Sequence, residues 1–199
     1  MLNITSRIKL SKKSLQKIKK LILKKNGLNS KSWDNISNKV KNEISIKLLF
    51  NQGPKCVYCE RYFIGETNEI DHFAHKGKYP QYTFITANLF YACNYCNSFV
   101  KNQRNTIYSL PQREYNRNFF AIVHPYYNNP DNEIFYKDED RVDINWDMCT
   151  DIGKETVVFW NWDKSIMTTI RTKTVLEQRL NPLTNDEEKI LIQEIIAYK

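Results

Sequence analysis

Two Cys-x-x-Cys pairs constrain the fold of this 199-residue chain more than any other feature. Cys56 and Cys59 form the first pair, Cys93 and Cys96 form the second, and residues 60–92 separate them. Two thiolates at this spacing can chelate one zinc ion from a tight turn, and two such turns complete a closed tetrahedral site. We therefore predict a structural four-cysteine zinc site that ties both ends of this segment together. A redox dithiol is the alternative interpretation of a single pair.

The compartment follows from the cysteines and from the apolar runs. The opening residues, MLNITSRIKLSKKS, contain no run of signal-sequence length, and no run elsewhere approaches a membrane span. Paired cysteines in such a chain indicate metal binding rather than disulfides. We expect a cytoplasmic protein with no membrane partner, and we expect the fifth cysteine, Cys149, to be a buried or neutral thiol.

The first 54 residues are predicted to be a helical extension. Ser11 is a suitable N-cap for a helix that ends near residues 26–27, and a second helix should start after Ser30 or Ser32 and stop at residues 53–54. The second helix carries a continuous apolar stripe at helical spacing: Trp33, Ile36, Val40, Ile44 and Leu48. The first helix is rich in lysine, which we interpret as a solvated face rather than a phosphate-binding face.

Residues 55–106 are predicted to form the functional core, and residues 107–199 an α/β region that packs on it in one unit. The later region should contain a meander of short strands at 134–136, 142–146 and 156–160. Helices should follow at 164–180 and from Thr184, which stands three residues before Glu187 in a capping-box pattern. The fold class is therefore α+β, with flanking helices around a small ββα centre.

The segment between the cysteine pairs contains the residues suited to phosphodiester chemistry: Asp71, His72, Asn88 and, directly after the second pair, Asn97. A histidine can take the proton of an attacking water, and oxygen ligands such as those of Asp71 and Asn97 can hold a divalent ion. Asn88 could hold the backbone that positions His72. Adjacent strand residues point to opposite faces, so Asp71 and His72 need a bulge or a strand end to serve one site.

These residues carry a resemblance to a known family. The order D-H, then N-L, then C-x-x-C-N, with cysteine pairs outside, resembles the HNH (ββα-metal) endonuclease motif. More narrowly, C-V-Y-C-E, E-I-D-H-F, K-x-x-Y-P and A-N-L-F-Y-A-C-N-Y-C-N resemble the HNH subunit of Septu (PtuB-like) and retron-associated anti-phage systems. The likeness covers residues 55–101.

The resemblance implies a role for each matching residue. His72 would be the general base, Asp71 and Asn97 the ligands of a catalytic Mg²⁺ or Mn²⁺, and Asn88 the structural asparagine. Lys101, four residues after Asn97, would contact a substrate phosphate. Lys76 is expected to bind nucleic acid as well. The chain departs from the family where His75 replaces a proline and Asn102 replaces a glycine.

The resemblance also implies partners. The implied substrate is a nucleic acid, with DNA expected first and RNA as the second choice. A formal charge of +8 agrees with a nucleic-acid substrate. An ABC/SMC-like (PtuA-like) ATPase subunit is implied, and because the chain contains no G-x-x-x-x-G-K-[ST] motif, any ATP dependence must come from that subunit.

A non-catalytic, zinc-stabilised module that binds nucleic acid or protein is the alternative function. Binding without catalysis does not require Asp71, His72 and Asn97 together, so their joint presence favours the nuclease. His124, which precedes a proline in a separate apolar stretch, is expected to be a structural histidine rather than a metal ligand.

Overall fold

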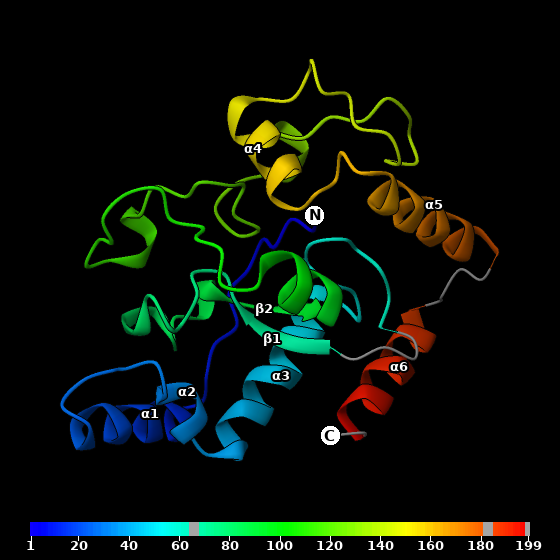
Figure 1. The fold of residues 1–199 in the computed structure, drawn as a ribbon. Helices are drawn as coiled ribbons and strands as arrows, with labels where there is room; N and C mark the ends of the chain where they lie inside the picture. Colours follow the sequence, from blue (N-terminus) through cyan, green and yellow to red (C-terminus); the bar gives the residue numbers. More distant parts are fainter. Residues whose placement is uncertain (64–67, 181–184, 198–199) are drawn as a thin grey trace.

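The computed structural model describes residues 1–63, 68–180 and 185–197. It is an α+β protein, as predicted, in which a small antiparallel sheet lies among helices (Figure 1). The helices are α1 (Lys12–Lys24), α2 (Ser32–Asn35), α3 (Asn38–Gln52), α4 (Asp151–Phe159), α5 (Ser165–Leu180) and α6 (Asn185–Ala197). The strands are β1 (Asn68–His72) and β2 (Leu89–Cys93), and the wide helical turn η3 (Tyr95–Lys101) follows β2.

The N-terminal helices begin and end largely where the sequence predicts. The side chain of Ser11 accepts a hydrogen bond from the Ser14 backbone N–H and caps α1. The helix α3 stops at Gly53, whose positive φ of 76° suits glycine. The single second helix that we expected is instead two helices, because Ile36 and Ser37 adopt extended backbone between α2 and α3. Ile36 is buried at this break, and its packing outweighs the helical periodicity.

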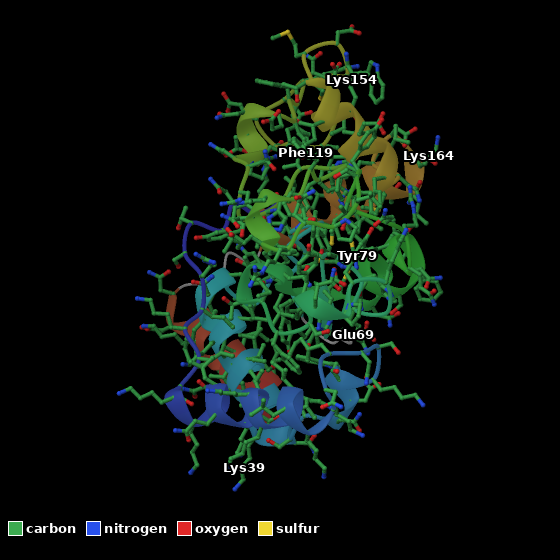
Figure 2. All side chains as sticks on the ribbon, turned by 90° about the vertical axis from the view of Figure 1, so that its left-hand side faces the viewer. Lys39, Glu69, Tyr79, Phe119, Lys154 and Lys164 are labelled. Atoms are coloured by element: carbon green, nitrogen blue, oxygen red, sulfur yellow. The ribbon has the colours of Figure 1, made fainter. Side chains whose placement is uncertain are left out.

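The sheet places the functional segment at the centre of the molecule. In the antiparallel register, Asp71 lies opposite Phe90 and His72 lies opposite Leu89. The helix α3 packs against β2, and α1 and α6 pack against α3. In the side view, Glu69 of β1 lies between the end of the molecule that carries Lys39 and the end that carries Lys154 (Figure 2). The main hydrophobic core includes residues from Ile4 to Ile195, so all three predicted regions contribute to it.

The predicted strand meander is wrong, because none of its three segments forms a strand. Residues 156–160 belong to α4 and the turn after it, and the other two segments meet only at one isolated bridge, between Tyr136 and Ile144. Thr150 caps α4 by accepting a hydrogen bond from the Gly153 N–H. This cap and the packing of Val157, which is fully buried, outweigh the strand preference of β-branched residues.

The C-terminal helices follow the predicted positions. The helix α5 begins at Ser165, one residue after the predicted start, and ends at Leu180. The expected cap Thr184 and the expected stop at residues 181–182 lie outside the described residues. Within the described part of the chain, no helix is both long and apolar enough to cross a bilayer.

Candidate metal centre and adjoining site

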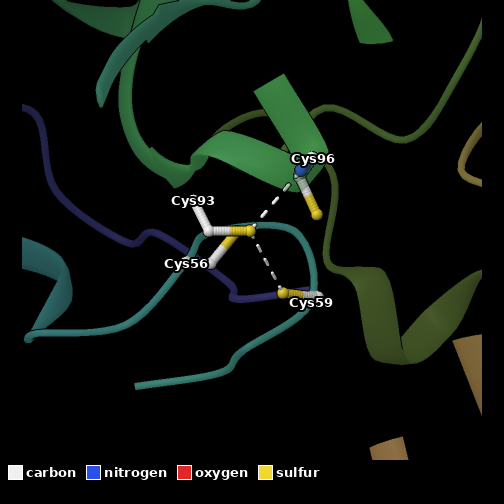
Figure 3. A group of neighbouring side chains, drawn as sticks. All are labelled: Cys56, Cys59, Cys93 and Cys96. Carbon is white, nitrogen blue, oxygen red and sulfur yellow. Dashed lines mark hydrogen bonds between the residues drawn. The ribbon is translucent and has the colours of Figure 1, made fainter. Parts of the chain in front are cut away.

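The four cysteines of the two pairs meet in one buried cluster, as predicted (Figure 3). Their sulfur atoms all lie within 4.8 Å of one another, and the Sγ atoms of Cys59 and Cys93 are 3.8 Å apart. Four sulfurs about 2.3 Å from a tetrahedral zinc ion would be separated by about 3.8 Å. The cluster therefore has the size, the donors and the number of ligands that a structural metal ion such as zinc requires.

Both cysteine pairs lie in turns shaped by local hydrogen bonds. In the first turn the Glu60 N–H donates to the Cys56 carbonyl, and Glu60 has a positive φ of 63°. In the second, the Cys96 N–H points to the Cys93 Sγ at 3.5 Å. Burial raises the pKa of Cys56, because a thiolate charge is costly away from water. A bound cation would offset that cost.

Asp71 is buried, and its carboxylate is already engaged. The Lys101 Nζ lies 2.7 Å from one oxygen, and the Tyr58 hydroxyl donates a short hydrogen bond to the other. Tyr58 belongs to the first cysteine turn, and its ring stacks on Trp160 with centroids 3.9 Å apart. The hydrogen bond from Tyr58 thus links the cysteine cluster directly to Asp71.

His72 is the last residue of β1, and its ring orientation is set by one hydrogen bond. The Nε2 atom lies 3.1 Å from the Thr83 carbonyl oxygen. Because a carbonyl only accepts, Nε2 carries the proton and Nδ1 of the neutral ring holds the free lone pair. Burial, followed by the positive charges of Lys101 and Lys76, lowers the pKa of His72 to about 3. The ring is therefore neutral at neutral pH.

Asn88 holds the backbone directly after His72. Its Oδ1 accepts from the Ala74 N–H at 2.7 Å and from the Tyr115 hydroxyl at 2.9 Å. Its Nδ2 donates to the carbonyls of Ala74 and Tyr82 at 3.2 Å and 3.1 Å. The side chain is fully buried, and these four bonds satisfy all of its hydrogen-bonding capacity. This arrangement suits the positioning task predicted for Asn88, whose part in catalysis stays a prediction.

Replacing Asn88 by alanine should destabilise the protein without removing any group that could do chemistry. The substitution removes the side-chain partner of the buried Ala74 N–H and carbonyl and one of the partners of the Tyr115 hydroxyl and the Tyr82 carbonyl. We therefore expect a loss of about 2–3 kcal/mol in the free energy of unfolding. Urea denaturation would measure it, with Asn38→Ala, at an exposed position of α3, as the control. An unchanged midpoint would contradict the positioning role.

Asn97 lies on η3, and its amide is oriented by Glu69. The Asn97 Nδ2 donates to Glu69 Oε2, and Ser98 donates to the same oxygen at 3.0 Å. Because a carboxylate only accepts, the amide nitrogen must face Glu69, and Asn97 Oδ1 has no partner among the described residues. Glu69 stands two residues before Asp71 on the same strand, and its role was not predicted from the sequence.

An open cavity of about 230 Å³ brings most of the predicted site residues together. Its wall includes Asp71, His72, Lys76 and Asn97, whereas Asn88 lies behind it. The other residues in the wall are Ile70, His75, Ser98, Asn102 and Gln103. The residues that the motif predicts to act together thus come from the end of β1, the following loop and η3.

Lys101 is placed differently from the prediction. It is 1% exposed, and its ammonium group bonds to Asp71 and to the His72 carbonyl, the latter at 2.8 Å. It is therefore an internal counter-ion and not a surface cation that waits for a phosphate. Lys76 does lie in the cavity wall, and it forms an ion pair with Asp34 of α2 at 3.3 Å. Its predicted contact with nucleic acid stays a prediction.

The N-terminal extension also contributes to the site, which the sequence analysis missed. The Trp33 ring of α2 meets the His72 ring edge-on, with centroids 4.8 Å apart. Trp33 was assigned only to an apolar stripe, because nothing in a helical periodicity shows which distant residue a side chain will contact. Tyr58 was missed as well, and the signal available for it was its place between two cysteines.

The two residues outside the site behave as expected. His124 is fully buried, and burial holds its pKa well below the ordinary value. Its Nδ1 accepts from the Tyr126 N–H, and its Nε2 lies 3.0 Å from the Tyr115 hydroxyl, so it supports Asn88 through Tyr115. Cys149 is buried apart from the four-cysteine cluster and points to the Asn145 carbonyl at 3.3 Å.

Comparison with known proteins adds little to this picture. No family model matches the chain, and no solved structure matches it. A stretch of 92 residues is 30% identical to "Protein ea31" of Escherichia phage lambda, and it makes up 46% of this chain and 26% of that protein. The chain thus spans about a quarter of the length of that relative, whose name states no activity.

Proposed function

We propose that this protein is a metal-dependent HNH endonuclease that hydrolyses phosphodiester bonds in nucleic acid. The observation that carries the proposal is the cavity wall, which brings Asp71, His72 and Asn97 together around one open space. These are a candidate base and two oxygen donors, and their order along the chain is the order of the HNH motif. A formal charge of +8 favours a polyanionic substrate.

His72 would accept the proton of an attacking water, and its ring is neutral but weakly basic in the free protein because its pKa is lowered to about 3. Its Nε2–H is held by the Thr83 carbonyl, so Nδ1 is the basic atom. The fixed tautomer means that the ring need not reorient before it takes a proton. Trp33, packed against the ring edge, restricts its movement further. The approach of a substrate phosphate would favour the protonated ring and so strengthen this base.

The donor set fits a divalent ion of the magnesium class. Asn97 Oδ1 lacks a partner in the described chain, and the Asp71 oxygens have acceptor capacity beyond their bonds to Lys101 and Tyr58. Asp71 and Asn97 would hold Mg²⁺ or Mn²⁺, and such an ion would neutralise charge on the scissile phosphate and the leaving oxygen. Lys101 would then limit how tightly the ion binds, because both cations compete for one carboxylate.

The test is cleavage of plasmid DNA, single-stranded DNA and structured RNA with Mg²⁺ or Mn²⁺, using wild-type protein and His72→Ala. We expect metal-dependent cleavage that falls at least about a hundredfold in the variant. Unchanged zinc content and circular dichroism would show that the variant is folded. Equal cleavage by both proteins would contradict the role of His72.

A non-catalytic binding module is the second candidate. The exposed lysines of α1 favour nucleic-acid binding, and the burial of Asp71 favours a non-catalytic role. It predicts nucleic-acid binding that His72→Ala leaves unchanged, with no cleavage by either protein under any metal condition.

We further propose that the nuclease acts with an ABC/SMC-like ATPase in anti-phage defence, as the resemblance implies. An ATPase that restrains or licenses the nuclease would also explain a lack of cleavage by the isolated chain. Co-expression followed by gel filtration tests the pairing, and the cleavage assay is then repeated with the complex. Separate elution at low salt would contradict it.

A further inference from the structure

A second cavity, of about 110 Å³, lies between the first cysteine turn and α5. Tyr58 and Cys59 form part of its wall on one side, and Met167 and Arg171 of α5 form part of it on the other. Trp162, in the turn before α5, completes this part of the wall. None of these residues belongs to the wall of the cavity at His72.

Arg171 is a buried cation that forms no ion pair within the described chain, although the charges of Asp143 and Asp138 act on it from a distance. It is 9% exposed, and its Nε and Nη2 donate to the Val142 and Trp162 carbonyls at 2.6 Å and 2.9 Å. Both acceptors are neutral, and Nη1 has no hydrogen-bond partner among the described residues. Burial lowers the pKa of Arg171, which reflects the cost of holding an unpaired charge there.

A second unused donor lies in the same wall. Trp162 is 2% exposed, and its Nε1–H has no partner in the part of the chain that the structure describes. Arg141 Nη2, in the same wall, is in an ion pair but also forms no hydrogen bond within the described chain. Buried donors are almost always paired, so these unpaired donors in the wall of one cavity indicate an absent acceptor. These donors require an acceptor, and the positive charge of Arg171 favours an anionic acceptor over a neutral one.

The other charges in this wall are already matched. Asp140 accepts two hydrogen bonds from Arg179, at 2.6 Å and 2.7 Å. Arg141 lies 2.9 Å from Asp131 and 3.8 Å from Glu60. Glu60 also pairs with the buried ammonium group of Met1 at 2.5 Å. With that group counted, three acidic and three basic groups balance, and Arg171 is left without an ion pair within the described chain.

We propose that this cavity binds a small oxyanion of the phosphate class, through the guanidinium of Arg171 and the indole N–H of Trp162. A guanidinium fork matches the oxygen geometry of a phosphate group and binds it strongly where water is excluded. The cavity is well below the roughly 300 Å³ of a drug-sized site, so it accepts the phosphate group and leaves any attached nucleoside outside. This proposal is independent of the nuclease assignment.

Titration calorimetry of the full chain with inorganic phosphate at constant ionic strength tests the proposal. We expect saturable binding by the wild-type protein, at least a tenfold weaker Kd for Arg171→Met and a smaller weakening for Trp162→Phe, which removes the N–H donor. Arg117→Met loses the same charge at an exposed site and should bind phosphate like the wild type. Adenosine 5′-monophosphate, run in parallel, shows whether the site takes a free ion only or also a terminal phosphate.

Two results would overturn the proposal. One is an absence of saturable heat from the wild-type protein up to about 10 mM phosphate, where a millimolar Kd would be visible. The other is equal weakening by Arg171→Met and Arg117→Met, which would show that net charge alone attracts the ion. If Arg171→Met does not fold, the wild-type titration and Trp162→Phe still decide the question.

Discussion

If the four-cysteine cluster holds a zinc ion, its removal is expected to unfold both cysteine turns and, with them, the central sheet. The four cysteines that would hold the ion come from the turn before β1 and from the junction of β2 with η3, so one ion ties these parts together. Structural zinc sites contribute about 10–16 kcal/mol in small domains, which equals or exceeds the whole stability of an ordinary domain at about 5–15 kcal/mol. Few other changes to the chain should lower the free energy of unfolding as much.

The measurement is metal content by mass spectrometry, followed by thermal melting with and without a strong chelator. We expect about one zinc per chain and loss of the cooperative transition when it is removed. Cys93→Ser should reproduce that loss, whereas Cys149→Ser, which replaces a buried thiol outside the cluster, should keep the zinc and a cooperative transition. A metal-free protein that melts at the same temperature would contradict the prediction, and a disulfide within the cluster would favour a redox dithiol.

Loss of the metal should also disturb the candidate active site. Tyr58 lies between two of the cysteines and donates its hydroxyl hydrogen bond to Asp71. If the turn loosens, Asp71 loses one of its two side-chain partners. We therefore expect any cleavage activity to disappear with the zinc even when Mg²⁺ is present in excess.

Lys101→Met is expected to destabilise the protein by about 3–5 kcal/mol, the usual cost of removing one partner of a buried ion pair. The two side chains are 1% and 3% exposed, and the Lys101 Nζ lies 2.7 Å from Asp71. Methionine fills a similar volume but leaves the Asp71 carboxylate buried with the Tyr58 hydroxyl as its one remaining side-chain partner among the described residues. The His72 carbonyl also loses a donor at the end of β1.

Urea denaturation of four proteins measures the interaction energy between Lys101 and Asp71. The four are the wild type, Lys101→Met, Asp71→Asn and the double variant. We expect the double variant to lose less unfolding free energy than the two single variants lose together, because it no longer contains an unpaired buried charge. The exposed Lys24→Met serves as the control for loss of charge. A loss below about 1 kcal/mol, the range of surface pairs, would mean that Lys101 reaches solvent in solution.

The same variant bears on the function. If Lys101 touched a substrate phosphate, as the motif implies, its loss would weaken nucleic-acid binding and leave stability nearly unchanged. The structure supports the opposite result, because the ammonium group is enclosed by Asp71 and the His72 carbonyl. Measuring stability and binding on one protein separates these outcomes.

The sequence by itself determined the features that depend on local spacing. Two Cys-x-x-Cys turns can each direct two sulfurs at one point, and the structure brings them within 4.8 Å as predicted. The start of α1 at Ser11 and the end of α3 at Gly53 were equally predictable, because a cap and a positive φ are properties of a few neighbouring residues. The α+β class followed from the same local signals.

The tertiary structure alone decided what depends on which distant segments meet. The same apolar spacing allows residues 156–160 to be strand or helix, and packing around Val157 selects the helix. The positions of Lys101 and Arg171 were hidden for the same reason, since a lysine or arginine looks the same in sequence whether it faces solvent or a buried cavity. Burial and the choice of partner are set by contacts between remote residues, which no local pattern encodes.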